Sequence, residues 1–249
     1  MSTTKLTRKE IAADPIHDAL INTVDVLRSR AKIIALSGAG LALVLLGIYF
    51  GLQYLETRDN AAQVELGKGM DYYHGTVDAA NAKDDPFASG PTPVFRSEEA
   101  KYRAASAVFS AVAARHGSSK IGVIARYYLG LCQKQLGQKS EAIASLEAVG
   151  INTADRTVGY LARKVLSTYY VETGDAKKGL DILQGMLKDP QCDLPKEDLL
   201  IDISRAYTAQ GKGAEALKSL EEAQATGMGG MLQSQVFQEL SRIQGSSGK

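Results

Sequence analysis

The chain has 249 residues, with 29 Lys and Arg against 28 Asp and Glu, two cysteines and no tryptophan. A formal net charge of +1 excludes the strongly basic surface of a nucleic-acid-binding protein, so we expect no nucleic-acid partner. Two cysteines 60 residues apart exclude a disulfide-rich scaffold, and abundant Ala, Leu, Gln, Lys and Glu favour helices.

The first segment is a polar tail, residues 1–32, with a net positive charge. Asp14-Pro15 is typical of a helix start, an N-cap followed by proline at the first helical position. The apolar residues that follow recur at helical spacing: Ile16, Leu20, Val24 and Leu27. We interpret this as a short amphipathic lead-in; an interfacial or partner-docking helix is the alternative.

An uncharged run, Ile33–Leu52, follows the tail. Its twenty residues would extend about 30 Å as a helix, the thickness of a bilayer core, so we predict a transmembrane anchor over 33–55. Arg28, Arg30 and Lys32 lie at its N-terminal edge, which predicts a cytoplasmic N-terminus and an external C-terminal domain. A cleaved signal peptide fits less well, because the preceding region is too long and no small-residue cleavage motif follows promptly.

Small residues share one face of the predicted span: Ser37, Gly40, Gly47 and Gly51. Such a stripe permits close approach of another membrane helix, from a different protein or from a second copy in a homo-oligomer. The alternative is the ordinary glycine content of membrane helices.

Residues 56–249 form the predicted external domain. Its first helix is expected over Glu56–Ala82, continuous with the anchor. Three prolines make 85–96 non-helical, and a second helix is expected over Ser97–Arg115, with Ser97 as its N-cap.

A period of 37 residues follows. Gly137, Gly174 and Gly211 recur at this interval. Three further columns keep the same spacing. Seven positions before each glycine is a small residue: Gly130, Ser167 and Ser204. Five positions after it is another small residue (Ala142, Gly179 and Ala216), and nine positions after it is a leucine (Leu146, Leu183 and Leu220). Ala105 and Phe109 extend the last two columns backward. This pattern predicts stacked helix–turn–helix units, each turning at its glycine, with a capping helix near 231–243.

These units resemble the tetratricopeptide repeat family, whose G-x-x-x-x-A-x-x-x-[FL] signature corresponds to GQKSEAIASL (137–146), GDAKKGLDIL (174–183) and GKGAEALKSL (211–220). The unit is 37 residues instead of the family's 34, and the closing proline is displaced or absent. The resemblance implies an all-α fold: one transmembrane helix, then an α-solenoid of tetratricopeptide-like helix pairs.

The layout of basic tail, single anchor and external repeats is similar to the YfgM-type family of bacterial inner-membrane proteins. That resemblance implies an inner-membrane protein with a periplasmic C-terminal domain. It also implies a scaffold beside the Sec translocon, with translocon subunits, a periplasmic chaperone or nascent clients as partners. A cell-envelope assembly or division adaptor, and a structural oligomer joined through the span, are the alternatives.

By analogy with the tetratricopeptide family, the first helix of each unit lines a peptide groove. The candidate positions are Ile124, Tyr127, Leu131, Leu161, Lys164, Thr168, Asp198, Ile201 and Arg205. The asparagine column of the family's clamp for acidic C-terminal tails is occupied by Leu131, Thr168 and Arg205, which disfavours that ligand. Packing of some positions against neighbouring helices is the alternative.

No catalytic, cofactor or metal site is predicted. Asp71-x-x-His74 offers half a metal site without further ligands at usable spacing. Cys132 lies among packing positions and is expected to be a small buried hydrophobe, while its pairing with Cys192 stays open. We therefore expect a non-enzymatic interaction protein without cofactors.

Overall fold

The computed structural model describes residues 40–41, 43–50, 60–88, 90–117, 119–151, 154–226 and 230–247. The chain divides into two compact units, Met1–Arg58 and Asp59–Lys249. In the first unit, 40–41 and 43–50 are helical, and the rest of the predicted span lies outside the described residues. No helix within the described ranges has both the length and the apolarity needed to cross a membrane.

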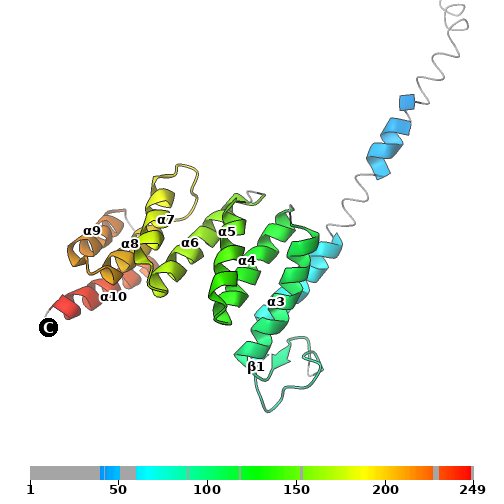
Figure 1. Ribbon diagram of the computed structural model, residues 1–249, viewed down its shortest axis with the longest axis horizontal. Coiled ribbons are helices and arrows are strands. Elements are labelled where there is room, and N and C mark those ends of the chain that lie inside the picture. Colours follow the sequence, from blue (N-terminus) through cyan, green and yellow to red (C-terminus); the bar gives the residue numbers. More distant parts are fainter. Residues whose placement is uncertain are drawn as a thin grey trace, which may run out of the picture. The chain divides into compact units, whose positions relative to one another are not determined.

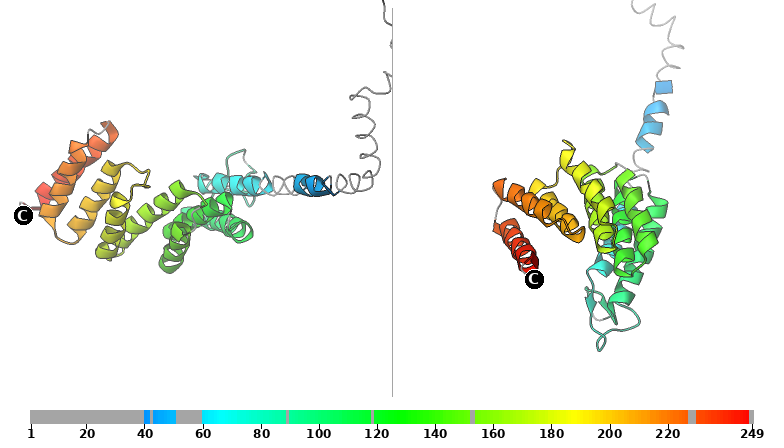
Figure 2. Two further views of the ribbon diagram at one scale, coloured as in Figure 1. Left: turned by 90° about the horizontal axis from the view of Figure 1, so that it is seen from above. Right: turned by 60° about the vertical axis from the view of Figure 1, so that its left-hand side comes forward.

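The second unit is a series of antiparallel helix pairs (Figures 1 and 2). A helix over 60–73 comes first. The elements after it are β1 (Thr76–Val77), β2 (Val94–Phe95), α3 (Glu98–Arg115), α4 (Lys120–Gln135), α5 (Lys139–Ile151), α6 (Arg156–Glu172), α7 (Ala176–Lys188), α8 (Lys196–Ala209), α9 (Gly213–Ala225) and α10 (Gly230–Ser247). Each helix from α3 to α9 contacts the next, and α10 packs on α8 and α9 as the predicted cap.

The three repeat glycines end the first helix of each pair in the same way. Gly137, Gly174 and Gly211 have φ of 71°, 95° and 73°, the left-handed region that favours glycine. The residue after each glycine donates its backbone N–H to a carbonyl five residues earlier, as Gln138 does to Gln133 at 2.9 Å. These are Schellman motifs, which satisfy carbonyls at the helix end and reverse the chain.

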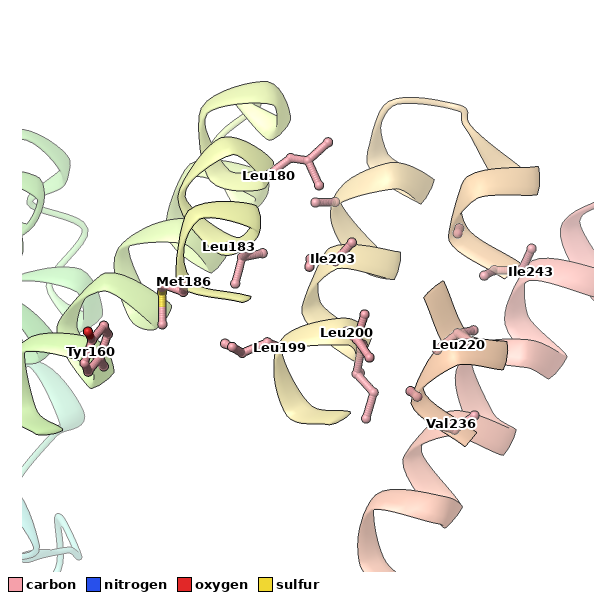
Figure 3. Packing of buried hydrophobic residues seen from close by; sticks show 14 residues of the cluster. Tyr160, Leu180, Leu183, Met186, Leu199, Leu200, Ile203, Leu220, Val236 and Ile243 are labelled. Atoms are coloured by element: carbon pink, nitrogen blue, oxygen red, sulfur yellow. The ribbon is translucent and has the colours of Figure 1, made fainter. Parts of the chain in front are cut away.

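The periodic leucines form the core between pairs. Leu146, Leu183 and Leu220 are fully buried, as are Ala105 and Phe109 of the earlier unit. Figure 3 shows the largest cluster, in which side chains from α7, α8, α9 and α10 meet around Leu183 and Leu220. No single pair encloses this cluster, so the stacking of neighbours creates the core.

The small-residue columns allow the two helices of a pair to approach closely. A Cβ on Gly130 would lie 2.8 Å from Cγ of Leu146. A Cβ on Gly179 would lie 2.5 Å from the carbonyl oxygen of Ser167, which is backbone and cannot rotate away. Glycine at 179 is therefore required by the separation of α6 and α7.

We expect Gly179→Ala to destabilise the protein by about 1–2 kcal/mol, because the clash exceeds the gain in helix propensity of about 1 kcal/mol. Gly185 is the matched control on the same helix, since a Cβ there meets nothing within 4 Å. Gly185→Ala should raise stability by about 0.5–1 kcal/mol. Chemical denaturation measures both; equal effects would contradict the close approach at 179.

The first pair differs from the prediction. The helix expected through Ala82 ends at Tyr73, and Thr76–Val77 pairs in parallel with Val94–Phe95, which adds two short strands to the predicted all-α fold. The physical reason is a contact across the loop: Gly75 lies against Phe95, where a Cβ would come within 2.7 Å of the ring, and two β-branched residues follow Gly75. The predicted cap is confirmed, since Ser97 Oγ accepts from Ala100 N at 3.1 Å.

The helix over 60–73 takes the place of a first helix and packs on α3. A Cβ on Gly69 would lie 2.6 Å from the Phe109 ring, and Arg115 pairs with Glu65 at 2.6 Å. Tyr73 contacts the rings of Tyr102 and Tyr128, with centroids at 5.6 and 5.3 Å. An aromatic cluster thus joins this pair to α4.

Candidate functional site

A cavity of about 450 Å³ lies between α6 and α8, the first helices of two consecutive pairs. We call it the groove cavity. Three of the predicted groove residues line it, Lys164, Thr168 and Arg205. The other lining residues are Val171, Glu172 and Asp202.

The remaining predicted groove residues are placed unevenly. Asp198 lies beside the cavity, with its carboxylate 3.0 Å from Lys164 Nζ. Tyr127 is half-buried; burial raises the pKa of its hydroxyl, and the neighbouring Lys164 charge opposes that rise. The other apolar positions on α4 and α6 are also half-buried: Ile124, Leu131 and Leu161.

Ile201 is a correction to the predicted groove. Its side chain is 0% exposed and belongs to the same core cluster as Val236 and Ile243 of α10. The cap packs on α8, so this position in the last pair is interior. It therefore does not line a binding surface.

Ion pairs connect the first helices from one pair to the next. Lys134 of α4 pairs with Glu172 of α6 at 2.9 Å. Lys164 of α6 lies 3.0 Å from carboxylate oxygens of both Asp198 and Asp202 of α8. The series continues into α10, where Arg205 contacts Glu239 at 2.7 Å and Arg242 contacts the same carboxylate at 2.8 Å. We call this series the inter-repeat ion ladder.

Asp202 is the buried centre of the ladder, with a side chain 1% exposed between Lys164 and Arg205. Sequence reasoning missed it. The sequence does contain a signal for Asp202 at its position in the repeat. The equivalent residues of the two preceding units, 37 and 74 positions earlier, are Val165 and Tyr128. A carboxylate in an otherwise apolar column indicates a buried polar contact.

The ladder shifts the pKa values of Lys164 and Glu239 toward their charged forms. Burial lowers the pKa of Lys164, but the Asp202 and Asp198 carboxylates outweigh it and the net shift is upward. Burial raises the pKa of Glu239, but hydrogen bonds from Arg205 and Arg242 outweigh it and the net shift is downward. Both directions favour intact ion pairs at neutral pH.

The lowered pKa of Glu239 predicts an acid-sensitive contribution to stability. This contribution is complete above its unfolded value of 4.5 and is lost as the pH falls through the lower folded value. Glu239→Gln should therefore be less stable than the wild type at pH 7, with the difference shrinking below pH 4.5. Urea denaturation across this range tests it, and a difference independent of pH would contradict it.

The basic side chains in and beside the groove cavity are already paired with carboxylates of the same chain. Lys134, Lys164, Arg205 and Arg242 all have carboxylate partners within the described ladder. Holding an acidic C-terminal tail would therefore require breaking an internal pair. At the cavity, Val171 offers apolar contact, and the Thr168 hydroxyl, which donates to the Val165 carbonyl at 2.9 Å, can still accept a hydrogen bond.

The cysteines are free and occupy different parts of the core, so the open question of their pairing is answered against a disulfide. Cys132 is fully buried beside Phe109, as expected of a small hydrophobe, and burial raises the pKa of its thiol to about 12. Cys192 packs against the α7–α10 cluster. Within the described ranges, no three His, Cys, Asp or Glu side chains gather closely enough to hold a metal ion.

Half of the predicted membrane contact face is described. A Cβ on Gly40 or on Gly47 would meet nothing within 4 Å. Ser37 and Gly51 lie outside the described residues.

Comparison with known proteins bears on the fold. No family model and no curated protein matches the chain. Among solved structures, it is similar to the nearly identical TPR-like repeats of a Podosopora anserina protein described as a putative kinesin light chain. A variant of that protein has 20% identity and a TM-score of 0.50, with 59% of this chain and 79% of that chain covered. Another structure of these repeats gives 20% identity and a TM-score of 0.49, covering 59% and 80%. The helix pairs of this chain therefore have the fold of tetratricopeptide-like repeats.

Proposed function

We propose that this protein is a membrane-tethered, non-enzymatic scaffold for protein–protein interactions. The observation that carries this proposal is the groove cavity, which is open between the first helices of consecutive tetratricopeptide-like pairs. A surface of this kind, built from several repeats, suits an extended or helical segment of a partner.

Support for the tether comes from residues 40–41 and 43–50. Every large apolar side chain described there is more than half exposed, from 51% at Leu46 to 70% at Leu43. The exposed positions are nearly consecutive, so the helix is apolar all round and has no polar face for water. The basic residues before it favour a cytoplasmic N-terminus and a repeat domain on the other side of the membrane, and the resemblance to the YfgM-type layout implies a bacterial inner membrane with the repeats in the periplasm.

For the partner, we propose translocon subunits, with a periplasmic chaperone or emerging client in the groove. The layout of basic tail, anchor and repeats supports this assignment. The cations of the groove cavity are already paired with carboxylates of the same chain. The groove therefore favours a partner that is bound through apolar side chains and backbone, and disfavours one that is bound through its terminal carboxylate. An envelope assembly or division adaptor using the same groove is the second candidate.

The tether is tested by carbonate extraction and by C-terminal reporter fusions of the full chain. We expect the protein to stay in the membrane pellet and alkaline phosphatase, which is active only outside the cytoplasm, to be active when fused to the C-terminus. Release by carbonate, or activity of a cytoplasmic reporter alone, would overturn the tether.

The groove is tested by Thr168→Trp, which places a bulky ring in the cavity. We expect translocon subunits or a chaperone to co-purify with the wild type from native membranes in mild detergent and to be lost with the variant. Thr226→Trp, at the C-cap of α9 and away from the cavity, is the matched control. Equal recovery with Thr168→Trp and the wild type would exclude the groove as the binding surface.

A further inference from the structure

A second cavity lies on another surface, between the second helices α5 and α7. Its volume is about 520 Å³, and it is largely apolar. Leu146, Leu166, Ile182 and Met186 supply its aliphatic lining. We call it the α5–α7 notch.

Two glycines make this notch wide. Gly150 and Gly185 both line it, and a Cβ on Gly185 meets nothing within 4 Å. The next pair has the equivalent cavity between α7 and α9, of about 330 Å³, with Leu187 and Glu222 at the positions 37 residues later. The chain thus contains a wide notch and a narrower counterpart, each between the second helices of two consecutive pairs.

The two notches also differ in charge. Asp181 is exposed at the α5–α7 notch, and no hydrogen bond or ion pair of its carboxylate occurs within the described ranges. Lys218 holds the equivalent position at the narrower notch. Arg163, the basic residue of the wide notch, is turned to the Gly150 carbonyl at 3.1 Å and to the ring of Tyr160. Asp181 is therefore an exposed carboxylate beside this apolar surface, and no ion pair in the described ranges offsets its charge.

We propose that the α5–α7 notch binds a basic amphipathic helix of a partner protein. One turn of aliphatic side chains would fill the apolar space, and a lysine or arginine beside them would pair with Asp181. Glu147, on the facing helix, is already paired: Lys178 lies 3.5 Å from its carboxylate, which also accepts a hydrogen bond from Tyr170 at 2.9 Å, so Asp181 alone is offered as the acidic anchor. This inference goes beyond the groove, because none of the residues of the notch lines the groove cavity.

The probe is a fluorescent helical peptide of about 15 residues with leucines on one face, flanked by lysines. Its dissociation constant is measured by anisotropy against the full-length protein in mild detergent. We expect saturable binding, and about tenfold weaker binding when the leucines are replaced by alanine. A peptide with glutamates in place of the lysines should bind still more weakly.

The decisive variant is Asp181→Lys/Gly185→Glu, which gives the wide notch the residues of its counterpart. Both positions are exposed on α7 and both changes raise helix propensity, so the fold should be retained. We expect about a tenfold loss of affinity, a smaller loss with Asp181→Asn alone, and no change with the matched control Lys218→Ala.

Thr168→Trp should leave peptide binding unchanged, which separates failure of the notch from failure of the groove. Equal affinity of the wild type and the double variant would overturn the proposal. So would equal affinity for the lysine and glutamate peptides. Concentration-dependent self-association that the double variant abolishes would also overturn it, because it would assign the notch to a second copy of the chain.

Discussion

Leu183→Ala should destabilise the repeat unit by about 2–5 kcal/mol. The side chain is fully buried in the largest core cluster and contributes to the interface between consecutive pairs. Truncation removes apolar contacts and leaves a cavity that the neighbouring helices, fixed by their own packing, fill only in part. Chemical denaturation followed by circular dichroism gives the loss directly.

Val64→Ala is the control for this measurement, because Val64 is 76% exposed. Its effect should stay within about 0.5 kcal/mol. Equal losses in the two variants would contradict the assignment of the leucine column to the core. Hydrogen exchange shows where the Leu183→Ala variant loses amide protection. A loss of protection confined to α6–α9 would indicate that each pair is stabilised mainly by its nearest neighbours, as is typical of a repeat array.

Asp202→Ala should destabilise the protein by about 2–3 kcal/mol. Removing one member of a fully buried ion pair costs about 3–5 kcal/mol, and the partial exposure of Lys164 and Arg205 lowers that cost here. The remaining carboxylates, Asp198 and Glu239, keep one partner for each cation. Asp202→Asn, which preserves volume and some hydrogen bonding, should be less destabilising.

A double-mutant cycle separates the ion pair from general packing. Combining Asp202→Ala with Lys164→Met should give a coupling energy of about 1 kcal/mol or more, because each change removes the same contact. Additive effects would show that Asp202 acts only by filling space. The ion pair of Asp202 with Lys164 would then contribute nothing to stability, and Asp202 would not be the centre of the inter-repeat ion ladder.

Periodicity predicts the repeats well because the same turn and the same contact between helix pairs occur three times in the chain. Each turn requires a residue at positive φ, and each pair requires a leucine facing its neighbour, so Gly174 and Leu183 are visible as columns. The first pair lacks this redundancy. The strand at Thr76–Val77 depends on a contact with Phe95 across a loop, and no spacing in the sequence reveals such a contact.

The candidate groove is only partly predictable for a related reason. Analogy with the tetratricopeptide family predicts which helix faces line a groove, and Lys164 and Thr168 lie around one cavity. It cannot identify which side chains are consumed by contacts between pairs. Ile201 is buried by the cap, and Asp202 is buried in ion pairs with Lys164 and Arg205.

The most direct test of the central claim is photo-crosslinking from position 168 of the full-length protein in native membranes. An identical crosslinker at Gln138, an exposed turn residue outside the groove cavity, is the control. We expect a defined adduct with a translocon subunit or a chaperone from Thr168 and none from Gln138. Equal adducts from both positions, or none from Thr168 while the partner still co-purifies, would contradict a groove-based scaffold.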